Sequence, residues 1–318
     1  MQATARAQPN IALIKYWGKR DTSRNLPAAG SISATLADLY TQMTVSFGAD
    51  ADSLTVNGAR DDALLPRISA CLDRVAGERR SPASVVSTCN FPVGAGLASS
   101  ASAFAATVVA ASAALGQSRS VAELASLAGQ ASGSAARSLY GGIAELRNAG
   151  DDIAVETLLP AADWPLRVVI AITRSGPKPV SSGEAMEASR RSSPFYDRWI
   201  SDQPHDLDVA RAAITARDFR ALGRIAEHNC LKMHSVMWAS RPPIVYWNEA
   251  TLSCLYRIRE LQSSGIDVFF TVDAGPQVKA FCVDGDEAQV SEALSQTPGV
   301  EQVLHSGLGP GAALVEPR

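Results

Sequence analysis

Residues 90–104 read Asn-Phe-Pro-Val-Gly-Ala-Gly-Leu-Ala-Ser-Ser-Ala-Ser-Ala-Phe, and we expect the rest of the chain to be built around them. The run just before them predicts a strand, and the apolar, small-residue run that they open predicts a helix. Gly94 and Gly96 let the backbone approach a ligand closely. Ser99 and Ser100 lie where a helix begins, and unpaired N–H groups at a helix start suit phosphate. The residues alone leave open an ordinary glycine–serine turn leading into a buried, Ala-rich helix.

Length and composition describe an ordinary globular protein. The chain has 318 residues, which is long for one core and suits two packed lobes. Its formal net charge is −3, and no long run of Lys and Arg indicates a nucleic-acid partner. The most apolar windows are too short or too rich in Ser and Ala to span a bilayer, so we expect no membrane association.

The cysteines and the first residues bear on the compartment. The first nine residues contain no apolar segment, so we expect no signal peptide. The five cysteines are odd in number and form no Cys-x-x-Cys pair, which favours free thiols in a reducing cytoplasm. The four histidines fall in no zinc-binding spacing, and His228 and His234 are interpreted as packing or surface residues.

Two further stretches of the first half carry polar side chains that could bind an anion. Lys15 and Lys19 end an extended run beside an aromatic pair and a glycine. They could face a cleft and bind phosphate or carboxylate, although their spacing alone favours a solvated strand end. Arg137 lies among serines and glycines, where its guanidinium could hold an anion bidentately. The alternative there is a second small-residue helix with an arginine at its solvent edge.

The other elements of the first half follow from periodicity and turn residues. We expect a helix over 64–75 and a helix from Ser120, whose Glu123 completes a capping-box pattern. Strands are predicted at 31–47 (as one long or two short strands), 52–58, 143–146, 153–158 and 166–173. The last of these is an unbroken apolar run, so we expect it to be central in its sheet.

The second half is predicted to be mostly helical before it returns to strands. Helical patterns dominate from 195 to 261, and the last helix is expected to begin at Arg241-Pro242-Pro243 and to end at Gly265. A buried strand follows and delivers Asp273 at its end, either as an Asx-turn former or as a catalytic carboxylate. Further elements are expected near 278–283, 286–295, 300–305 and 312–315.

Four stretches together resemble one known family. They are NIALIKYWGKRD (10–21), GLASSAS (96–102), SGSAARSLYGG (132–142) and FFTVDAGPQVK (269–279). In this order the stretches are similar to the motifs of the diphosphomevalonate decarboxylases, which belong to the GHMP kinase superfamily. The whole superfamily shares the glycine–serine loop, whereas the other three stretches are typical of the decarboxylase branch.

The resemblance implies an α+β fold. The N-terminal half, residues 1–174, would be of the ribosomal-S5-domain-2-like type and would carry the ATP-phosphate loop. The C-terminal half, residues 175–318, would be ferredoxin-like, with a deep cleft between the halves. The resemblance also implies a cytoplasmic homodimer of the mevalonate route to isoprenoids.

The implied reaction uses ATP and Mg²⁺. ATP phosphorylates the tertiary 3-hydroxyl of 5-diphosphomevalonate, and phosphate then leaves together with CO2 to give isopentenyl diphosphate. Phosphorylation suits this chemistry because it converts a poor leaving group into a good one. Little covalent work falls to the protein, so donors around the phosphates supply most of the stabilisation.

Site residues are implied by matching the motifs position by position. The implied catalytic residues are Asp273, Arg137 and Lys15. The implied substrate-binding residues are Tyr16, Lys19, Ser132, Ser134, Arg137, Ser182 and Met186. The implied ATP-binding residues are Gly94, Gly96, Leu97, Ser99, Ser100 and Ser102. The metal ligands are left open.

Two departures from the family pattern leave alternatives open. The phosphate loop has an additional glycine at Gly94. After Ser182 the chain has Gly183-Glu184 where the family commonly has Arg or Thr, which removes a possible diphosphate contact and adds a carboxylate. The alternative substrate is therefore 5-phosphomevalonate, and a different small-molecule kinase of the superfamily is the alternative activity.

Overall fold

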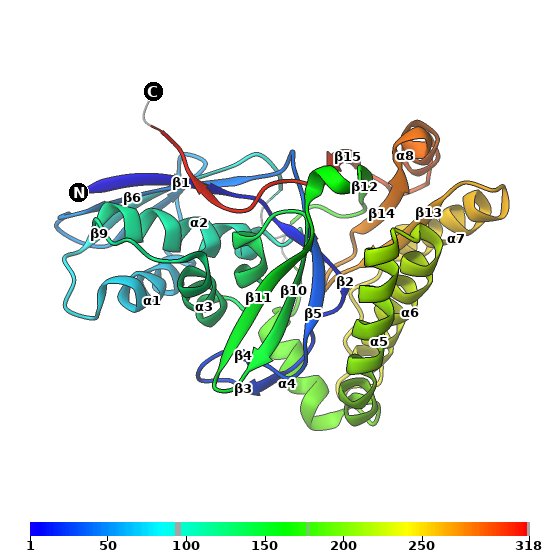
Figure 1. Cartoon of the computed structure of the whole chain (residues 1–318), viewed down its shortest axis with the longest axis horizontal. Helices are drawn as coiled ribbons and strands as arrows, with labels where there is room; N and C mark the ends of the chain where they lie inside the picture. Colours follow the sequence, from blue (N-terminus) through cyan, green and yellow to red (C-terminus); the bar gives the residue numbers. More distant parts are fainter. Residues whose placement is uncertain (93–96, 177, 317–318) are drawn as a thin grey trace.

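The computed structural model describes residues 1–92, 97–176 and 178–316. It contains three larger β-sheets with helices packed on them, and the predicted α+β class is confirmed (Figure 1). Pairing within the sheets is antiparallel except between β7 and β9. Among the described residues, no helix is both long and apolar enough to cross a membrane.

The first sheet has six strands and carries the helix that follows the glycine-rich loop. In spatial order its strands are β16 (Ala313–Leu314), β1 (Gln2–Ala7), β6 (Thr41–Phe47), β9 (Ala83–Cys89), β7 (Ser53–Val56) and β8 (Ala59–Arg60). Alternate residues of β6 are buried, as a strand with one covered face requires. Helices α1 (Leu65–Ala76) and α2 (Ser99–Ala114) pack on this sheet, and α3 (Val121–Ala131) packs against both helices. The predicted strand before the loop and the helix after it are therefore confirmed as β9 and α2.

Helix α2 packs against β1 and β6 and is buried on nearly all sides. Its small residues permit this because alanine and serine let neighbouring backbones approach closely. Helix α3 begins with the predicted capping box, in which the Ser120 side chain accepts from the Glu123 N–H and the Glu123 carboxylate accepts from the Ser120 N–H.

The second and third sheets have four strands each. The second consists of β11 (Asp152–Leu159), β10 (Ile143–Ala149), β5 (Ser31–Thr35) and β2 (Asn10–Ile14). The third consists of β13 (Val268–Val272), β14 (Val278–Val283), β12 (Leu166–Ile172) and β15 (Gln302–Gly307). Strand β12 lies between two partners, as its apolar run predicts. A hairpin of β3 (Lys19–Asp21) and β4 (Leu26–Pro27) projects beside the second sheet.

The remaining helices cover the second and third sheets. They are α4 (Ser182–Ser192), α5 (Tyr196–Ala216), α6 (Phe219–Trp238), α7 (Glu249–Ser263) and α8 (Glu287–Ser295), with the short 3-10 helices η1 (Ala135–Leu139), η2 (Ala161–Asp163) and η3 (Asp284–Asp286). One apolar core joins residues of both sheets to α5 and α6, including Ile11, Ile170 and Phe281. This core brings the ends of β2 and β13 together, which decides where the functional site lies.

One helix boundary differs from the prediction. Helix α7 begins at Glu249 rather than at Arg241, with Asn248 accepting from the Thr251 N–H as its cap. Two consecutive prolines cannot donate backbone hydrogen bonds, and the residue before a proline avoids the helical region. The predicted end is correct, since Gly265 follows the helix at φ 91°.

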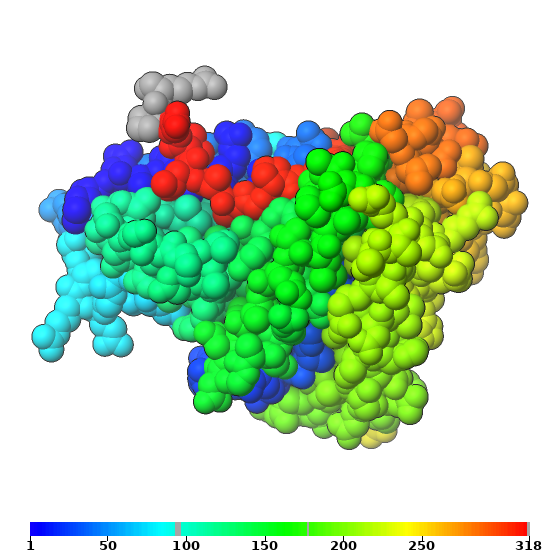
Figure 2. Space-filling model, in the orientation of Figure 1, coloured from blue at the N-terminus to red at the C-terminus, as the bar shows by residue number. Residues whose placement is uncertain are grey.

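Strands from one predicted half of the chain pair with strands from the other half. Strand β12 pairs with strands from the last third of the chain, and β16 returns to pair with β1 (Figure 1). The division of the chain at residue 174 stays a prediction. Figure 2 shows the C-terminal segment, in red, lying on the surface of the N-terminal part.

Candidate active site

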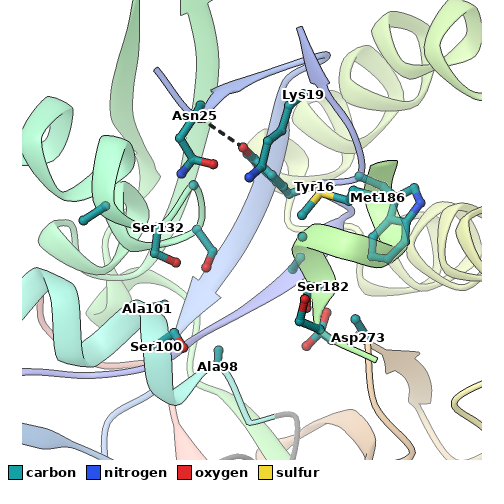
Figure 3. A pocket seen from close by; sticks show the side chains of 18 of the residues that line it. Tyr16, Lys19, Asn25, Ala98, Ser100, Ala101, Ser132, Ser182, Met186 and Asp273 are labelled. Atoms are coloured by element: carbon teal, nitrogen blue, oxygen red, sulfur yellow. Dashed lines mark hydrogen bonds between the residues drawn. The ribbon is translucent and has the colours of Figure 1, made fainter. Parts of the chain in front are cut away.

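A cavity of about 650 Å³ opens between α2, η1, α4 and the ends of β2 and β13 (Figure 3). It gathers most of the residues that the sequence singles out, although they lie up to 258 positions apart in the chain. The predicted site residues on its walls are Lys15, Tyr16, Lys19, Ser99, Ser100, Ser132, Ser134, Arg137, Ser182, Met186 and Asp273.

Asp273 and Lys15 form an ion pair at the base of this cavity. Each follows directly after a buried strand, Lys15 after β2 and Asp273 after β13. The Lys15 Nζ donates to Asp273 Oδ1 at 2.6 Å and to the Ala12 carbonyl at 2.9 Å. The Lys15 side chain is 1% exposed and that of Asp273 is 22% exposed, so the carboxylate is the more accessible partner.

Two lysines determine the charge state of Asp273. Lys279 on β14 places its Nζ 3.4 Å from Asp273 Oδ2. Burial alone would raise the pKa of the Asp273 carboxyl, but the ammonium groups of Lys15 and Lys279 outweigh burial and lower the pKa to about 2. Asp273 is therefore an anion throughout the neutral pH range.

The backbone of Lys15 is held by a buried polar network from α5 and α6. The Asn229 side chain accepts from the Lys15 N–H at 2.8 Å, and Gln203 donates to the Lys15 carbonyl at 2.9 Å. Asn229 in turn donates to Gln203 and to Asp206, each at 2.6 Å. The sequence analysis missed these residues because helical periodicity does not reveal which polar residue meets a strand end.

Arg137 enters the cavity wall from η1 and is 2% exposed. Its Nε donates to Asn10 Oδ1 at 3.2 Å, and its Nη1 donates to the Ser31 hydroxyl. Asn10 also donates to the Ser134 carbonyl at 3.0 Å and to the Ser138 hydroxyl at 2.8 Å, which ties η1 to β2. Burial lowers the pKa of Arg137 to about 10, so the guanidinium keeps its charge at neutral pH.

Tyr16 and Lys19 line the side of the cavity near the β3–β4 hairpin. The Tyr16 hydroxyl donates to the Asn25 carbonyl at 3.4 Å, as Figure 3 shows. A Cβ atom at Gly133 would lie 2.2 Å from the Tyr16 hydroxyl oxygen, so only glycine allows this approach. Burial and the neighbouring Arg67 lower the pKa of Lys19.

The start of α2 forms the opposite wall of the cavity. Ser99 and Ser100 are the first two residues of the helix and line the cavity, next to Ala98 at φ 56°. A helix start presents N–H groups and the positive end of the helix dipole, which suits an anion. Gly94 and Gly96, expected to bind ATP, lie outside the described residues.

The side chains of Leu97 and Ser102, both expected to bind ATP, lie in the protein interior, and their role in ATP binding stays a prediction. Leu97 is 1% exposed and packs in the core with Phe91, because an apolar side chain at the loop end gains most from burial. The Ser102 hydroxyl is fully buried and bonds to the Thr41 hydroxyl at 2.8 Å and to the Ser99 carbonyl at 3.1 Å. Both side chains lie away from the cavity and support the position of α2.

Helix α4 supplies Ser182 and Met186, and it changes the interpretation of Glu184. The Glu184 carboxylate accepts from the Ser181 N–H at 3.1 Å, which completes a capping box with the Ser181 hydroxyl. Gly183 lines the cavity, whereas Glu184 does not. The additional carboxylate that the sequence places near the phosphate tail is thus used at the helix start instead.

Three cations on the cavity wall were missed by the sequence analysis. Arg67 and Arg74 reach the cavity from α1, and Lys178 reaches it from the segment before α4. The Lys178 Nζ donates to Ser182 Oγ at 2.6 Å and to the Ala274 carbonyl at 3.1 Å. The spacing of Arg67 and Arg74 puts them on one helix face, but nothing in the sequence aims that face at a cavity.

Charge on the cavity wall is strongly unequal. Its basic residues are Lys15, Lys19, Arg67, Arg74, Arg137 and Lys178, and its acidic residue is Asp273. Within the described ranges, no three residues of the His, Cys, Asp and Glu types are grouped to hold a metal ion. His228 is exposed and His234 is fully buried beside the Val272 carbonyl. The excess of basic side chains on the cavity wall suits ligands that carry several negative charges.

Comparisons with known proteins agree with this geometry. Residues 7–155 match the family described as diphosphomevalonate decarboxylase-like N-terminal domain, and residues 168–307 match the mevalonate 5-diphosphate decarboxylase C-terminal domain. The chain is 32% identical to the diphosphomevalonate decarboxylase of Candida albicans over 97% of this chain and 96% of that protein.

Solved structures give the same assignment. The mevalonate diphosphate decarboxylase of Staphylococcus aureus has a TM-score of 0.92 and 34% identity, covering 99% of this chain and 98% of that chain. A structure described as MDDEF in complex with MVAPP, AMPPCP and magnesium has a TM-score of 0.93 and 35% identity, covering 100% of this chain and 99% of that chain. The fold is thus the GHMP kinase fold, and the chain belongs to the diphosphomevalonate decarboxylase family.

Proposed function

We propose that this protein catalyses the ATP-dependent decarboxylation of 5-diphosphomevalonate to isopentenyl diphosphate, with ADP, phosphate and CO2 as the other products. The observation that carries this proposal is the meeting of Lys15, Arg137 and Asp273 in one cavity with the start of α2. A kinase that only transferred phosphate would need the helix start but would not need a buried arginine placed for a substrate carboxylate.

The reaction has two steps that place different demands on the site. First, the tertiary hydroxyl attacks the terminal phosphorus of ATP, its proton passes to an oxygen of the transferred phosphate, and ADP leaves. Then the C–O bond to the new phosphate breaks, and the C–C bond to the carboxylate breaks as well. The electron pair of that C–C bond forms the new double bond, and CO2 leaves. Positive charge develops at the tertiary carbon in the second step.

Asp273 fits an orienting and electrostatic role. A carboxyl group with a pKa of about 2 accepts a hydrogen bond from the substrate hydroxyl but is a weak proton acceptor. Its fixed negative charge favours positive charge at the neighbouring carbon. Lys15, at 2.6 Å from Asp273, holds the carboxylate and brings a cation close to the incoming phosphate.

Arg137 is suited to bind the substrate carboxylate. Asn10 and Ser31 fix its guanidinium, so its remaining N–H groups are preorganised for a planar anion. A fixed fork can hold the carboxylate in one plane while the bond to CO2 breaks. The ammonium group of a lysine, on a flexible side chain, would move with the carboxylate and allow it to rotate.

The nucleotide phosphates fit the wall formed by the start of α2 and Lys178. The Ser99 and Ser100 hydroxyls are oxygen donors that suit a hard cation there. Mg²⁺ usually keeps several waters and takes one or two protein oxygens plus substrate phosphates, so this donor set fits a magnesium ion that arrives with ATP. Bound there, it would neutralise charge on the phosphates.

The phosphate tail of the substrate fits the side lined by Lys19, Ser132 and Ser134. Arg67 and Arg74 add positive charge on the cavity wall, and Glu184 is turned away. Each additional charge-assisted contact contributes about 1.5–3 kcal/mol, so we expect the diphosphate to be preferred over the monophosphate by about tenfold or more in kcat/KM.

One coupled assay that records ADP and CO2 separately tests the proposal. The purified protein is given ATP, Mg²⁺ and either 5-diphosphomevalonate or 5-phosphomevalonate. Equal amounts of ADP and CO2 with the diphosphate support the function. ADP without CO2 would indicate a kinase, and a higher kcat/KM for the monophosphate would favour the alternative substrate. The expected homodimer and cytoplasmic location stay predictions.

A further inference from the structure

Lys279 is a fully buried cation that the reaction described above leaves without a role. It lies on β14, an inner strand of the third sheet, and its side chain is 0% exposed. In the register of that sheet it stands opposite Thr271 of β13. Thr271 precedes Asp273 by two positions, and residues two apart in a strand share a face. The sheet therefore directs Lys279 and Asp273 to the same side.

The two oxygens of Asp273 each have a lysine of their own. Oδ1 lies 2.6 Å from the Lys15 Nζ, and Oδ2 lies 3.4 Å from the Lys279 Nζ. Oδ1 accepts a hydrogen bond from Lys15, whereas Oδ2 makes no hydrogen bond within the described residues and meets Lys279 as an ion pair. A cation at each oxygen restrains the plane in which the carboxylate meets a ligand. Burying an ammonium group is costly unless an opposite charge compensates, and Asp273 supplies that charge for Lys279.

Lys279 differs in one respect from the other cations around Asp273. Lys15, Arg137 and Lys178 line the cavity, so incoming phosphates or carboxylates can attract them away from the aspartate. Lys279 is not on the cavity wall, and its 0% exposure keeps it from touching a ligand. A bound ligand therefore does not draw Lys279 away, and the electrostatic attraction between Lys279 and Asp273 persists when the cavity is occupied.

We infer that Lys279 is a positioning residue, which holds the Asp273 carboxylate in its reactive plane from behind the cavity. It acts through Asp273 and not on the substrate. The inference rests on the proposed function for its effect on turnover. The electrostatic coupling between Lys279 and Asp273 does not depend on that function.

The first test compares Lys279→Met with a control on the same strand. Methionine keeps the length of the side chain and removes the charge. We expect kcat to fall about ten- to a hundredfold, the effect of losing one charge-assisted contact, while the KM for ATP stays within about threefold. The control is Cys282→Ala, a change at a buried residue of β14 that faces the opposite core, and we expect its kcat to stay near that of the wild type.

The second test is a double-mutant cycle that needs no activity. Asp273→Asn leaves Lys15 and Lys279 buried near each other without the carboxylate, so its Tm should fall. Adding Lys279→Met should raise the Tm again, because the repulsion between the two ammonium groups is removed. If Lys279 only filled space, the Tm loss of the double variant would equal the sum of the losses in Asp273→Asn and Lys279→Met.

Each outcome bears on the inference. Wild-type kcat in Lys279→Met, an equal loss in Cys282→Ala, or additive Tm losses would overturn it. If Lys279→Met alone does not fold, a folded double variant with Asp273→Asn supports the coupling and an unfolded one overturns it. If the wild type releases no CO2, the proposed function fails, and the Tm cycle still decides whether Lys279 and Asp273 are coupled.

Discussion

The two sides of the cavity are built in different ways. The reaction wall, which we define as Lys15, Arg137 and Asp273, consists of charged side chains at strand ends and in η1, and each is held by polar partners on the protein. The nucleotide wall, defined as Ser99, Ser100 and Lys178, lies at the start of α2 and in the segment before α4, and its side chains are half-buried.

The difference follows from what each side has to do. Breaking a C–C bond requires a carboxylate, an arginine and a cation in one fixed arrangement, and such preorganisation has to be present before the substrate arrives. Phosphates carry many equivalent oxygens, so several donors can share them and no single donor is indispensable. We therefore expect large effects from the reaction wall and graded effects from the nucleotide wall.

The largest expected effect is that of Asp273→Asn. The change removes the charge and preserves the shape, so kcat should fall by about three orders of magnitude or more, which corresponds to at least about 4 kcal/mol. The protein should still unfold cooperatively and bind an ATP analogue. Single-turnover assays of CO2 release measure the effect. Retention of more than about a tenth of wild-type turnover would remove Asp273 from the reaction wall.

Arg137→Lys should have the next largest effect. Lysine keeps the charge but cannot contact Asn10, Ser31 and a ligand with one planar group. We expect kcat/KM for the organic substrate to fall about ten- to a hundredfold, with the KM for ATP nearly unchanged. The matched control is Arg147→Lys, at an exposed pair with Glu156, which should leave both constants unchanged. Equal losses for ATP and for the organic substrate would contradict a role restricted to the substrate carboxylate.

Single alanine substitutions on the nucleotide wall should act more weakly. Ser99→Ala and Ser100→Ala should each lower kcat/KM for ATP by about tenfold, because one hydroxyl contact to a charged phosphate is lost. Ser102→Ala is the control within the same helix: its hydroxyl bonds to Thr41, so the Tm should fall while kcat/KM for ATP stays the same. If Ser102→Ala lowered kcat/KM for ATP and the other two variants did not, the ATP phosphates would bind elsewhere.

The smallest expected effect is the pH dependence that Lys178 imposes. Burial lowers the pKa of Lys178 to about 8, so the free enzyme carries this charge below pH 8 and loses it as the pH rises. Since kcat/KM reports the free enzyme, kcat/KM for ATP should decline severalfold as the pH rises through about 8. Lys178→Arg should move this decline to higher pH. An identical profile in the variant would assign the decline to another group.

The sequence predicts the elements of the fold better than the contents of the cavity. Alternating burial in β6, the capping boxes and the apolar run of β12 are local properties, and local patterns reveal them. The predicted start of α7 is wrong because the two prolines after Arg241 suit a first turn, whereas the helix is capped at Asn248.

Residues that depend on contacts across the fold could not be found in this way. Lys15 and Asp273 are 258 positions apart, and only the resemblance to a family brought them together before the structure did. Arg67 has no such support, since a basic residue on a helix is usually solvated, and Lys279 ends the fourth matching stretch although the resemblance gives it no role. Their positions follow from how the sheets pack, which no single segment encodes.

The pairing of β16 with β1 ties the two ends of the chain together. Leu314 stands opposite Ala5 and Ala313 opposite Arg6, so the last strand belongs to the same sheet as the first. A single cut after Arg174 would leave β12 and β16 each on a different fragment from strands that they pair with. The two pieces are therefore complementary halves joined by two exchanged strands, which makes this chain suited to reassembly from fragments and poorly suited to expression of either half alone.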